Sequence, residues 1–399
     1  MVRPARKIPL QPLHARENLR DSPRNVPAMI RETRIAIFTL CALLSVMLLV
    51  GCSRENRQDL GETQIEKLIL TAAPRLDSPD IWAKAVKESL EEIGVPVSKE
   101  NTCAVIAVIE QESGFKTVPK TPGIRTVLLN RLNNAEGNPI VRFIIDSRLD
   151  QQAGNGKTFR RNIDSIESER DVALWYDEFI AADVTRPILQ VLDKDVDNLI
   201  TTIGSMQVSV KFAAHYPKKP KNVGHSDIRK VLYTCKGGVF YGSAYLLDYS
   251  HRYDDLKYVF ADYNAGRYAC RNAGFQKMLA NLTGKTIVPD GDLLSYKNGN
   301  AHFGDTYGIV IEYLGKTGMT FDDETIRRDF RKEKTRDFEE TFTYRTISAL
   351  HESRFGKRID AGMPQIPLKS DKFSGRNLST DWFASRVKAR FERCMRTNL

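Results

Sequence analysis

The chain has 399 residues, 41% of them hydrophobic, and a formal net charge of +10. This length is enough for one large domain or two modest ones, each with a substantial core. The sequence contains no zinc-ligand spacing, phosphate loop, RNA-binding signature or internal repeat. We therefore expect no metal, no cofactor and no nucleic-acid partner. A modestly basic body suits an anionic polymer or a membrane surface, but this indication is weak.

An uncharged, mostly apolar run spans residues 35–51. It is short for a membrane span. Because a basic stretch precedes it and a small residue and a cysteine follow it, it is typical of a secretory signal. Its end, Leu-Val-Gly-Cys at 49–52, resembles the bacterial lipobox, which implies that Cys52 is lipidated and becomes the mature N-terminus. Ser53 then implies an outer-membrane lipoprotein that faces the periplasm. An uncleaved signal anchor is the alternative.

The residues before Met29 are rich in arginine and proline and have no apolar pattern. The stretch that begins at Met29, Met-Ile-Arg-Glu-Thr-Arg, is an ordinary start for a signal peptide. Translation is therefore expected to start at Met29, with residues 1–28 as an upstream extension and 29–52 as the signal peptide. The polar residues that follow, 53–70, are expected to tether the folded body to the lipid.

Helical signals begin at residue 78. Ser78 is expected to cap a helix whose first residue is Pro79. Ser98 is expected to cap the next helix, which runs to Glu112. Periodic apolar residues indicate further helical segments at 173–180, 238–249, 256–263 and 275–282. The sequence therefore predicts a mainly α protein.

Four cysteines remain in the mature chain, in what we expect to be an oxidising compartment: Cys103, Cys235, Cys270 and Cys394. Four cysteines allow three complete pairings, and the sequence does not choose among them. Cys103 lies in an apolar helix, where a free thiol that packs in the core is a further alternative.

Glu112 is the most informative residue of the chain. It follows the apolar run 103–109 and opens the tetrapeptide Glu-Ser-Gly-Phe. A carboxylate at the end of a buried helix is costly. Desolvation and the negative end of the helix dipole both favour its protonated form. A carboxylic acid that stays protonated near neutral pH suits a general acid. An exposed glutamate at a helix end is the structural alternative.

Two later segments favour the functional interpretation. Residues 203–207 read Ile-Gly-Ser-Met-Gln, and residues 262–266 read Asp-Tyr-Asn-Ala-Gly, preceded by Gly-Ser-Ala-Tyr-Leu at 242–246. Each piece alone more often caps a helix or packs in a core. In this order, behind a lipobox, they resemble the soluble-type lytic transglycosylases of the goose-lysozyme superfamily. The resemblance implies a lysozyme-like transglycosylase core.

The resemblance also implies an unusual reaction on peptidoglycan glycan strands. Most glycosidases use two carboxylates. In these enzymes a single glutamate protonates the glycosidic oxygen, and the substrate's own N-acetyl group stabilises the anomeric centre. The same glutamate then deprotonates the muramic 6-hydroxyl, which closes a 1,6-anhydro ring. Glu112 would be this acid and base. Glu110 is a nearby rival, but it lacks the following Ser-x-Phe.

Six further residues are implied to contact the substrate or to support the site: Ser113, Met206, Gln207, Tyr245, Tyr263 and Asn264. The serine would hold the turn or orient the glutamate, and the methionine and glutamine would line the sugar groove. The first tyrosine would lie near the glutamate. The asparagine would bind acetamido or hydroxyl groups, with the second tyrosine packed beneath it. For Met206 and Tyr263 a position in the core is the alternative.

The chain departs from typical relatives in its spacing. Glu112 and Met206 are 94 positions apart here, far more than in those relatives. Residues 117–200 are therefore expected to be a large insertion within a transglycosylase domain, 71–284. The insertion would extend, cover or block the groove. Residues 285–399 would be a C-terminal extension that either stands apart or packs back onto the body.

Two other functions stay open. A true hydrolase of the same fold would need a carboxylate that activates water, for which Asp177, Glu178 or Asp262 are candidates. Asp262 is expected to face solvent if Tyr263 packs inward, because consecutive helical residues point about 100° apart. The other function is that of an inactive, glycan-binding envelope lipoprotein. The stretches AVIEQES, GSMQVSV and ADYNAGRYA are also similar to a family of Gram-negative lipoproteins catalogued only as a domain of unknown function.

Overall fold

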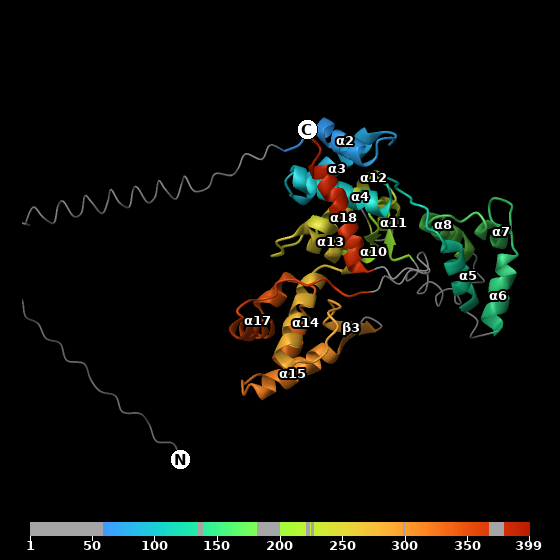
Figure 1. The fold of residues 1–399 in the computed structure, drawn as a ribbon. Coiled ribbons are helices and arrows are strands. Elements are labelled where there is room, and N and C mark those ends of the chain that lie inside the picture. Colours follow the sequence, from blue (N-terminus) through green and yellow to red (C-terminus); the bar gives the residue numbers. More distant parts are fainter. Residues whose placement is uncertain are drawn as a thin grey trace, which may run out of the picture. The chain divides into compact units, whose positions relative to one another are not determined.

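The structure is a computed structural model that describes residues 59–134, 139–181, 200–220, 224, 227–297, 300–366 and 379–399. All of these lie in one compact unit, Gln58–Leu399, which is mainly helical (Figure 1). The predicted start at Met29, the signal peptide and the lipidated Cys52 lie outside the described residues. Within the described ranges, no helix is both long enough and apolar enough to cross a membrane.

Helix α4 (Lys99–Glu112) is the central helix of the first hydrophobic core. Its consecutive residues 102–109 are all buried, and this run of more than two turns faces every direction around the helix axis. A helix that is apolar on all sides is stable only inside a protein. Within the described ranges, the helices that pack most closely against it (Figure 1) are α2 (Glu62–Ala72), α3 (Pro79–Ile93), α12 (Cys235–Leu247) and α18 (Thr380–Met395).

The last helix, α18, is fastened to α4. Cys394 forms a disulfide with Cys103 of α4, with the two Cα atoms 5.6 Å apart. Lys99 donates from its ammonium group to the carbonyl oxygens of Met395 and Thr397, at 2.8 and 2.7 Å. These contacts satisfy carbonyl groups that a helix end leaves without intrahelical partners. The end of the chain therefore belongs to the first core.

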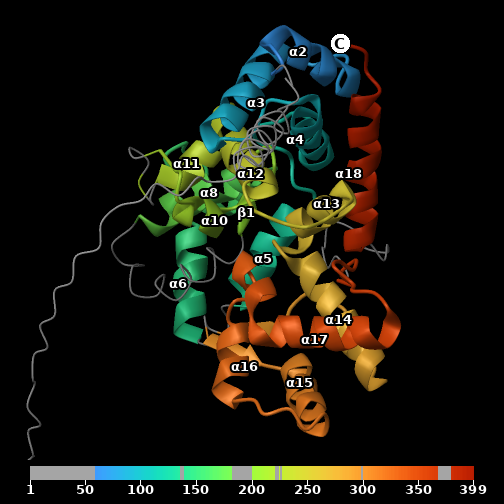
Figure 2. The ribbon, with the colours of Figure 1, turned by 90° about the vertical axis from the view of Figure 1, so that its left-hand side faces the viewer.

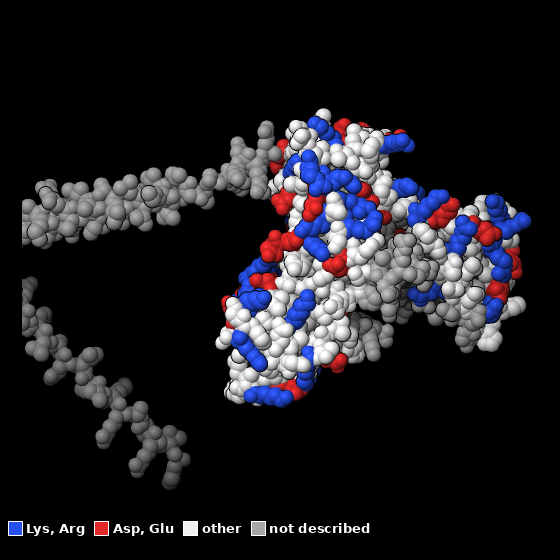
Figure 3. Space-filling view, viewed as in Figure 1, with Lys and Arg blue, Asp and Glu red and all other residues white. Residues whose placement is uncertain are grey.

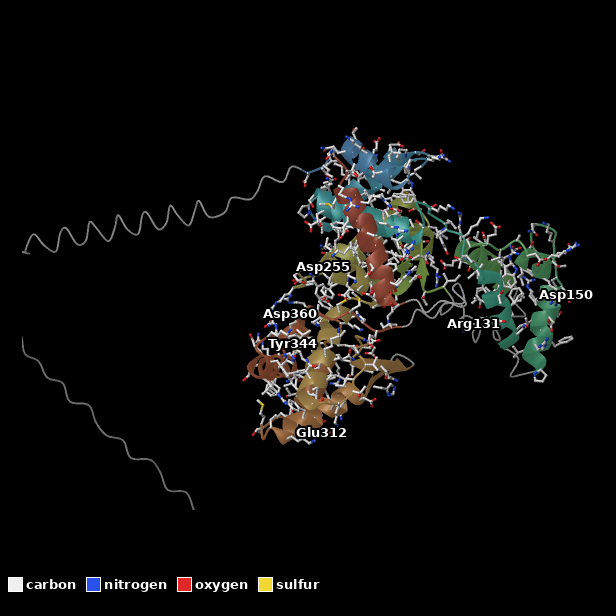
Figure 4. The ribbon with its side chains drawn as sticks, viewed as in Figure 1. Arg131, Asp150, Asp255, Glu312, Tyr344 and Asp360 are labelled. Carbon is white, nitrogen blue, oxygen red and sulfur yellow. A yellow bond between two sulfur atoms is a disulfide. The ribbon has the colours of Figure 1, made fainter. Side chains whose placement is uncertain are left out.

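Ion pairs align α18 with helix α13 (Leu256–Ala265). Asp255, labelled in Figure 4, caps α13 and pairs with the ammonium group of Lys388 at 2.6 Å. Lys257 pairs with Asp381 at 2.8 Å. Exposed pairs of this kind contribute little stability. The position of α18 therefore rests mainly on the disulfide and on its buried apolar face.

The described part of the expected insertion is helical. It contains α5 (Ile124–Asn134), α6 (Pro139–Leu149), α7 (Phe159–Ile163) and α8 (Glu169–Ile180). The ring of Phe159 packs edge-on against Trp175 and Phe179, with centroids 6.0 and 5.3 Å away. The guanidinium group of Arg148 lies 4.4 Å above the same ring. Aromatic packing thus holds α6, α7 and α8 together.

The two later motifs lie between residues 200 and 266. A short antiparallel hairpin pairs β1 (Thr202–Ile203) with β2 (Val208–Ser209) and encloses the Gly-Ser-Met-Gln turn. The helices that follow are α10 (Val210–His215), α11 (Ile228–Leu232), α12 and α13. Helix α12 contacts both α3 and α4, so the hairpin and the end of α4 share one core.

Helix α14 (Ala269–Thr283) joins the first core to a second one. Cys270 packs in the first core, whereas Phe275 packs in the second. Helix α17 (Phe342–Phe355) crosses α14 in Figure 2, and its Tyr344, labelled in Figure 4, stacks on Phe275 with the ring centroids 5.9 Å apart. The second core also includes β3 (Leu294–Lys297) paired with β4 (Asn300–Phe303), α15 (Asp305–Lys316), α16 (Asp323–Phe330), the 3-10 helix η3 (Arg336–Glu340) and α17.

The helices predicted from the sequence are confirmed as α3, α4, α8, α12, α13 and α14. Ser98 caps α4 as expected, accepting from the backbone N–H of Asn101. Ser78 precedes α3 in a left-handed conformation and makes no side-chain cap hydrogen bond. Pro79 and the buried stripe that includes Trp82 therefore define the start of α3, without help from the serine.

Two expected boundaries differ from the structure. Residues 62–70, expected to belong to the tether, lie in α2, because Ile65, Leu68 and Ile69 form an apolar stripe that is buried. Position 284 does not separate two independent bodies, since α14 reaches both cores and α18 returns to α4. The extension thus packs back onto the body.

Surface charges of both signs are interspersed on the face shown in Figure 3.

The disulfide should contribute a large part of the attachment of α18, beside its buried apolar face. Removing it with Cys103→Ala and Cys394→Ala should lower the free energy of unfolding by about 2–5 kcal/mol, because the bridge restricts the unfolded chain over a separation of 291 residues. Denaturant titration of the oxidised protein and of the double variant measures this difference. Cys235→Ala is the control, since Cys235 is free. Equal stability of the double variant and the native protein would contradict the expectation.

Candidate active site

The turn after α4 has a fixed conformation. Gly114 and Phe115 both adopt left-handed backbone angles, with φ of 58° and 62°. The hydroxyl of Ser113 donates to the carbonyl of Ile109 and accepts from the backbone N–H of Lys116. A non-glycine residue with positive φ persists only where its surroundings hold it, and Phe115 is buried. The serine thus holds the turn that carries half-buried Glu112 at its start.

The Gly-Ser-Met-Gln turn fits closely against α12. Gly204 has a φ of 85°, and a Cβ there would lie 2.3 Å from the carbonyl oxygen of Leu232. A Cβ on Gly238 would lie 2.7 Å from the Ser205 hydroxyl. A Cβ on Gly242 would lie 2.3 Å from the Met206 sulfur. Glycines four residues apart on one face of α12 therefore make room for the turn.

Tyr263 brings the motifs together. Its hydroxyl donates to the carbonyl oxygen of Met206 at 2.6 Å, and its ring packs edge-on against Tyr245 at 5.2 Å. Burial and the nearby Glu112 carboxylate hold the pKa of Tyr263 well above its usual range. The phenol therefore stays protonated and remains a donor. The end of α4, the turn, α12 and α13 thus meet around one buried ring.

Arg267 is a residue that the sequence interpretation missed. Its guanidinium group donates to the carbonyl oxygen of Tyr245 at 3.0 Å and to that of Ala244. It lies over the rings of Phe212, Tyr245 and Tyr249, at 4.9, 5.2 and 4.9 Å. It therefore fixes the end of α12, where Tyr245 packs on Tyr263. Its position directly after the Tyr-Asn-Ala-Gly motif was the sequence feature that could have identified it.

Asp262 does not face solvent, and this corrects the expectation. It is fully buried, and its carboxylate accepts from the hydroxyls of Tyr249 and Tyr253 and from the backbone N–H groups of Tyr268 and Cys270. Burial raises its pKa, and these hydrogen bonds oppose the rise. The chain turns sharply after α13, so the start of α14 folds over the carboxylate. Asp262 is thus a structural acceptor.

The remaining predicted site residues differ in how accessible their side chains are to a ligand. Met206 is fully buried beneath Gly242, so its side chain packs in the core and does not line a groove. Gln207 is half-buried with a φ of 49°, and its amide bonds the carbonyl of Gly204 at 3.2 Å. Asn264 is exposed, and no side-chain hydrogen bond is recorded for it within the described ranges. Of these three, Asn264 is the side chain most available to a ligand.

The structure separates Glu112 from its rival. Glu110 pairs with Arg390 and Arg393 of α18. Residues two apart on a helix point about 200° apart, so Glu112 faces away from α18, on the side of Tyr263. Of the other candidate carboxylates, Glu178 accepts from the backbone of Gly154 inside the expected insertion.

The side chains gathered at this site are suited to acid–base chemistry. The described residues contain no group of three or more His, Cys, Asp or Glu side chains that could hold a metal ion. What they bring together is one half-buried carboxylate, two tyrosine rings and, one residue further on, an exposed amide. A carboxylic acid in partly apolar surroundings is suited to proton transfer.

The comparisons with known proteins identify the family. The model of a family described as "Protein of unknown function (DUF1615)" matches residues 75–397, so the chain belongs to that family. The chain is also similar to "Uncharacterized protein YaiW" of Escherichia coli (strain K12), with 33% identity over 371 residues that cover 91% of this chain and 100% of the relative. No solved structure matches. The resemblance to a lipoprotein family of unknown function is thereby confirmed in its coarser form, as a family of unknown function.

Gly242→Ala adds only one methyl group, but it should disturb the packing of the site. The new Cβ would lie 2.6 Å from the Cβ of Met206, so the Gly-Ser-Met-Gln turn must shift. We expect a loss of about 1–3 kcal/mol in the free energy of unfolding. Gly308→Ala is the matched control, because that helical glycine is exposed and has open space around it. It should stabilise by about 0.5–1 kcal/mol. Denaturant titration of both variants tests the pair, and equal effects would refute the close fit.

Proposed function

We propose that this protein is a peptidoglycan lytic transglycosylase with a lysozyme-like core, anchored as an outer-membrane lipoprotein that faces the periplasm. The observation that supports the proposal is the convergence on Tyr263. Four motifs that resemble those of the goose-lysozyme superfamily, in the same order, lie far apart in sequence. Tyr263 contacts residues of two of the other motifs, Met206 and Tyr245, and Glu112 of the first motif lies near enough to raise the pKa of Tyr263. Motifs that matched by chance would have no reason to lie close together in the folded protein.

In the proposed reaction Glu112 acts twice. As an acid it protonates the oxygen of the bond between N-acetylmuramic acid and N-acetylglucosamine, while the substrate's acetamido group stabilises the anomeric carbon. As a carboxylate it then takes the proton of the muramic 6-hydroxyl, which closes the anhydro ring. Tyr245 and Tyr263 form the apolar wall beside the glutamate. Exposed Asn264 is positioned to donate to an acetamido or hydroxyl oxygen.

The burial of Asp262 favours this reaction over hydrolysis. A hydrolase needs a second carboxylate, roughly 5–10 Å from the first, to act as a nucleophile or to activate water. Asp262 has both oxygens engaged by four donors and is shielded from solvent. It cannot present a free oxygen to water without breaking that network. A muramidase would therefore have to use another carboxylate.

Glu112→Gln should abolish the digestion of purified sacculi, because it removes the transferable proton with little change in shape. Loss of the only acid and base should lower the digestion rate by more than the roughly 10²–10⁴-fold expected for an auxiliary group. Mass spectrometry of the products of the native protein should show 1,6-anhydromuropeptides, lighter by one water than hydrolysis products. Reducing-end muramic acid as the main product would instead favour the muramidase.

Glu110→Gln is the control for that experiment. It makes the same chemical change two residues away, at a side chain that pairs with Arg390 and Arg393. It should keep its digestion rate within a few-fold and lose about 1–3 kcal/mol of stability, because the side chains of Glu110 and Arg390 are largely buried. Loss of digestion in Glu110→Gln with retention in Glu112→Gln would reverse the assignment.

Cys52→Ser should release the protein from membranes. Lipidation of that thiol is the proposed attachment, and a single transmembrane helix would not be lost by this change. Membrane fractionation followed by a salt wash measures the effect, with Cys235→Ser as the matched control. Retention of Cys52→Ser in the washed membranes would favour the uncleaved signal anchor.

A further inference from the structure

A cavity adjoins the turn that carries Glu112. It has a volume of about 650 Å³ and is lined by the loop between α2 and α3, by Trp82 and by residues 114–116. This volume lies within the range of about 300–1,000 Å³ that is common for small-ligand sites. Trp82 and Phe115 form its apolar floor, with their rings edge-on at 5.4 Å. Both rings are almost completely buried, so the floor is rigid.

The rim of the cavity is charged. Arg75, Asp77 and Lys116 line it, and all three are exposed. None of the ion pairs or side-chain hydrogen bonds recorded within the described ranges involves these three side chains. Two cations and one anion around an apolar floor suit a ligand with more carboxylates than ammonium groups. An uncharged sugar would leave these charges unused.

We propose that this cavity binds an acidic peptide, the stem peptide that peptidoglycan strands carry on muramic acid. The assignment rests on the proposed function for the identity of the peptide, and on the charges and volume for its chemistry. A stem that ends in diaminopimelate has three free carboxylates and one ammonium group. Arg75 and Lys116 bind the carboxylates, Asp77 binds the ammonium group, and the alkyl chain lies on Trp82.

The position of the cavity gives the peptide a role in specificity. Gly114, Phe115 and Lys116 line it, and the first two also form the left-handed turn that follows Glu112. The backbone N–H of Lys116 is bonded to the Ser113 hydroxyl. A peptide in the cavity therefore contacts the turn that holds the catalytic glutamate. The enzyme would favour strands that carry stems over strands from which the stems have been removed.

Direct binding of a free peptide tests the assignment without requiring activity. The probe is N-acetyl-L-alanyl-γ-D-glutamyl-meso-diaminopimelate, titrated into the Glu112→Gln protein by calorimetry and by tryptophan fluorescence. We expect saturable binding that weakens with salt, because the contacts are exposed charges. Arg75→Ala with Lys116→Ala should weaken it roughly three- to thirtyfold. Lys67→Ala with Lys157→Ala removes two charges elsewhere and should leave it unchanged.

A second measurement compares sacculi with stem-free strands prepared by an amidase. The Arg75→Ala, Lys116→Ala protein should lose activity on sacculi and keep it on stem-free strands. Absence of saturable peptide binding, or equal binding by this variant and the native protein, would overturn the inference even if sacculi are cleaved. Peptide binding by a protein that cleaves no glycan would support the cavity and sink the proposed enzymatic function instead.

Discussion

The burial of α4 on every side is the constraint on which the rest of the structure depends. Residues 102–109 leave no polar face, so the helix must be enclosed by α2, α3, α12 and α18. Enclosure fixes both its position and its end. A carboxylate at the last residue of such a helix emerges from the core at one defined place. The catalytic role proposed for Glu112 depends on this geometry, because distant parts of the chain supply the neighbours of that place.

Glycine supplies the second constraint. The turn at 204–207 reaches the end of α4 only because α12 has no side chain at Gly238 and Gly242. The turn in return offers the carbonyl of Met206 to Tyr263. Packing and function are therefore difficult to separate at this site. A residue such as Met206 can resemble part of a motif because the fold needs it, with no requirement that its side chain meet a ligand.

Local signals predicted local structure well. The boundaries of α4 followed from Ser98 and from the apolar run before Glu112, and the stripes of α3 and α13 followed from their periodicity. The sequence interpretation failed where a residue's interaction partner lies far away in sequence or was not considered. Asp262 was placed in solvent from its angle to Tyr263 alone, whereas the segments on both sides of α13 fold over it and supply donors, among them the hydroxyl of Tyr253. The partner of Cys103 lies 291 positions along the chain, so spacing alone did not identify it.

The same separation has a consequence for how the chain matures. Cys103 must wait for almost the whole of the remaining chain before Cys394 is present, and it meets Cys235 and Cys270 first. Pairing in order of appearance would therefore trap a wrong crosslink, with α4 incompletely covered. In the folded protein burial raises the pKa of Cys235 to about 12, which keeps its thiol from exchanging. The nascent chain lacks that protection, so a thiol that pairs wrongly during synthesis stays open to exchange until Cys394 arrives and the last helix closes over the core.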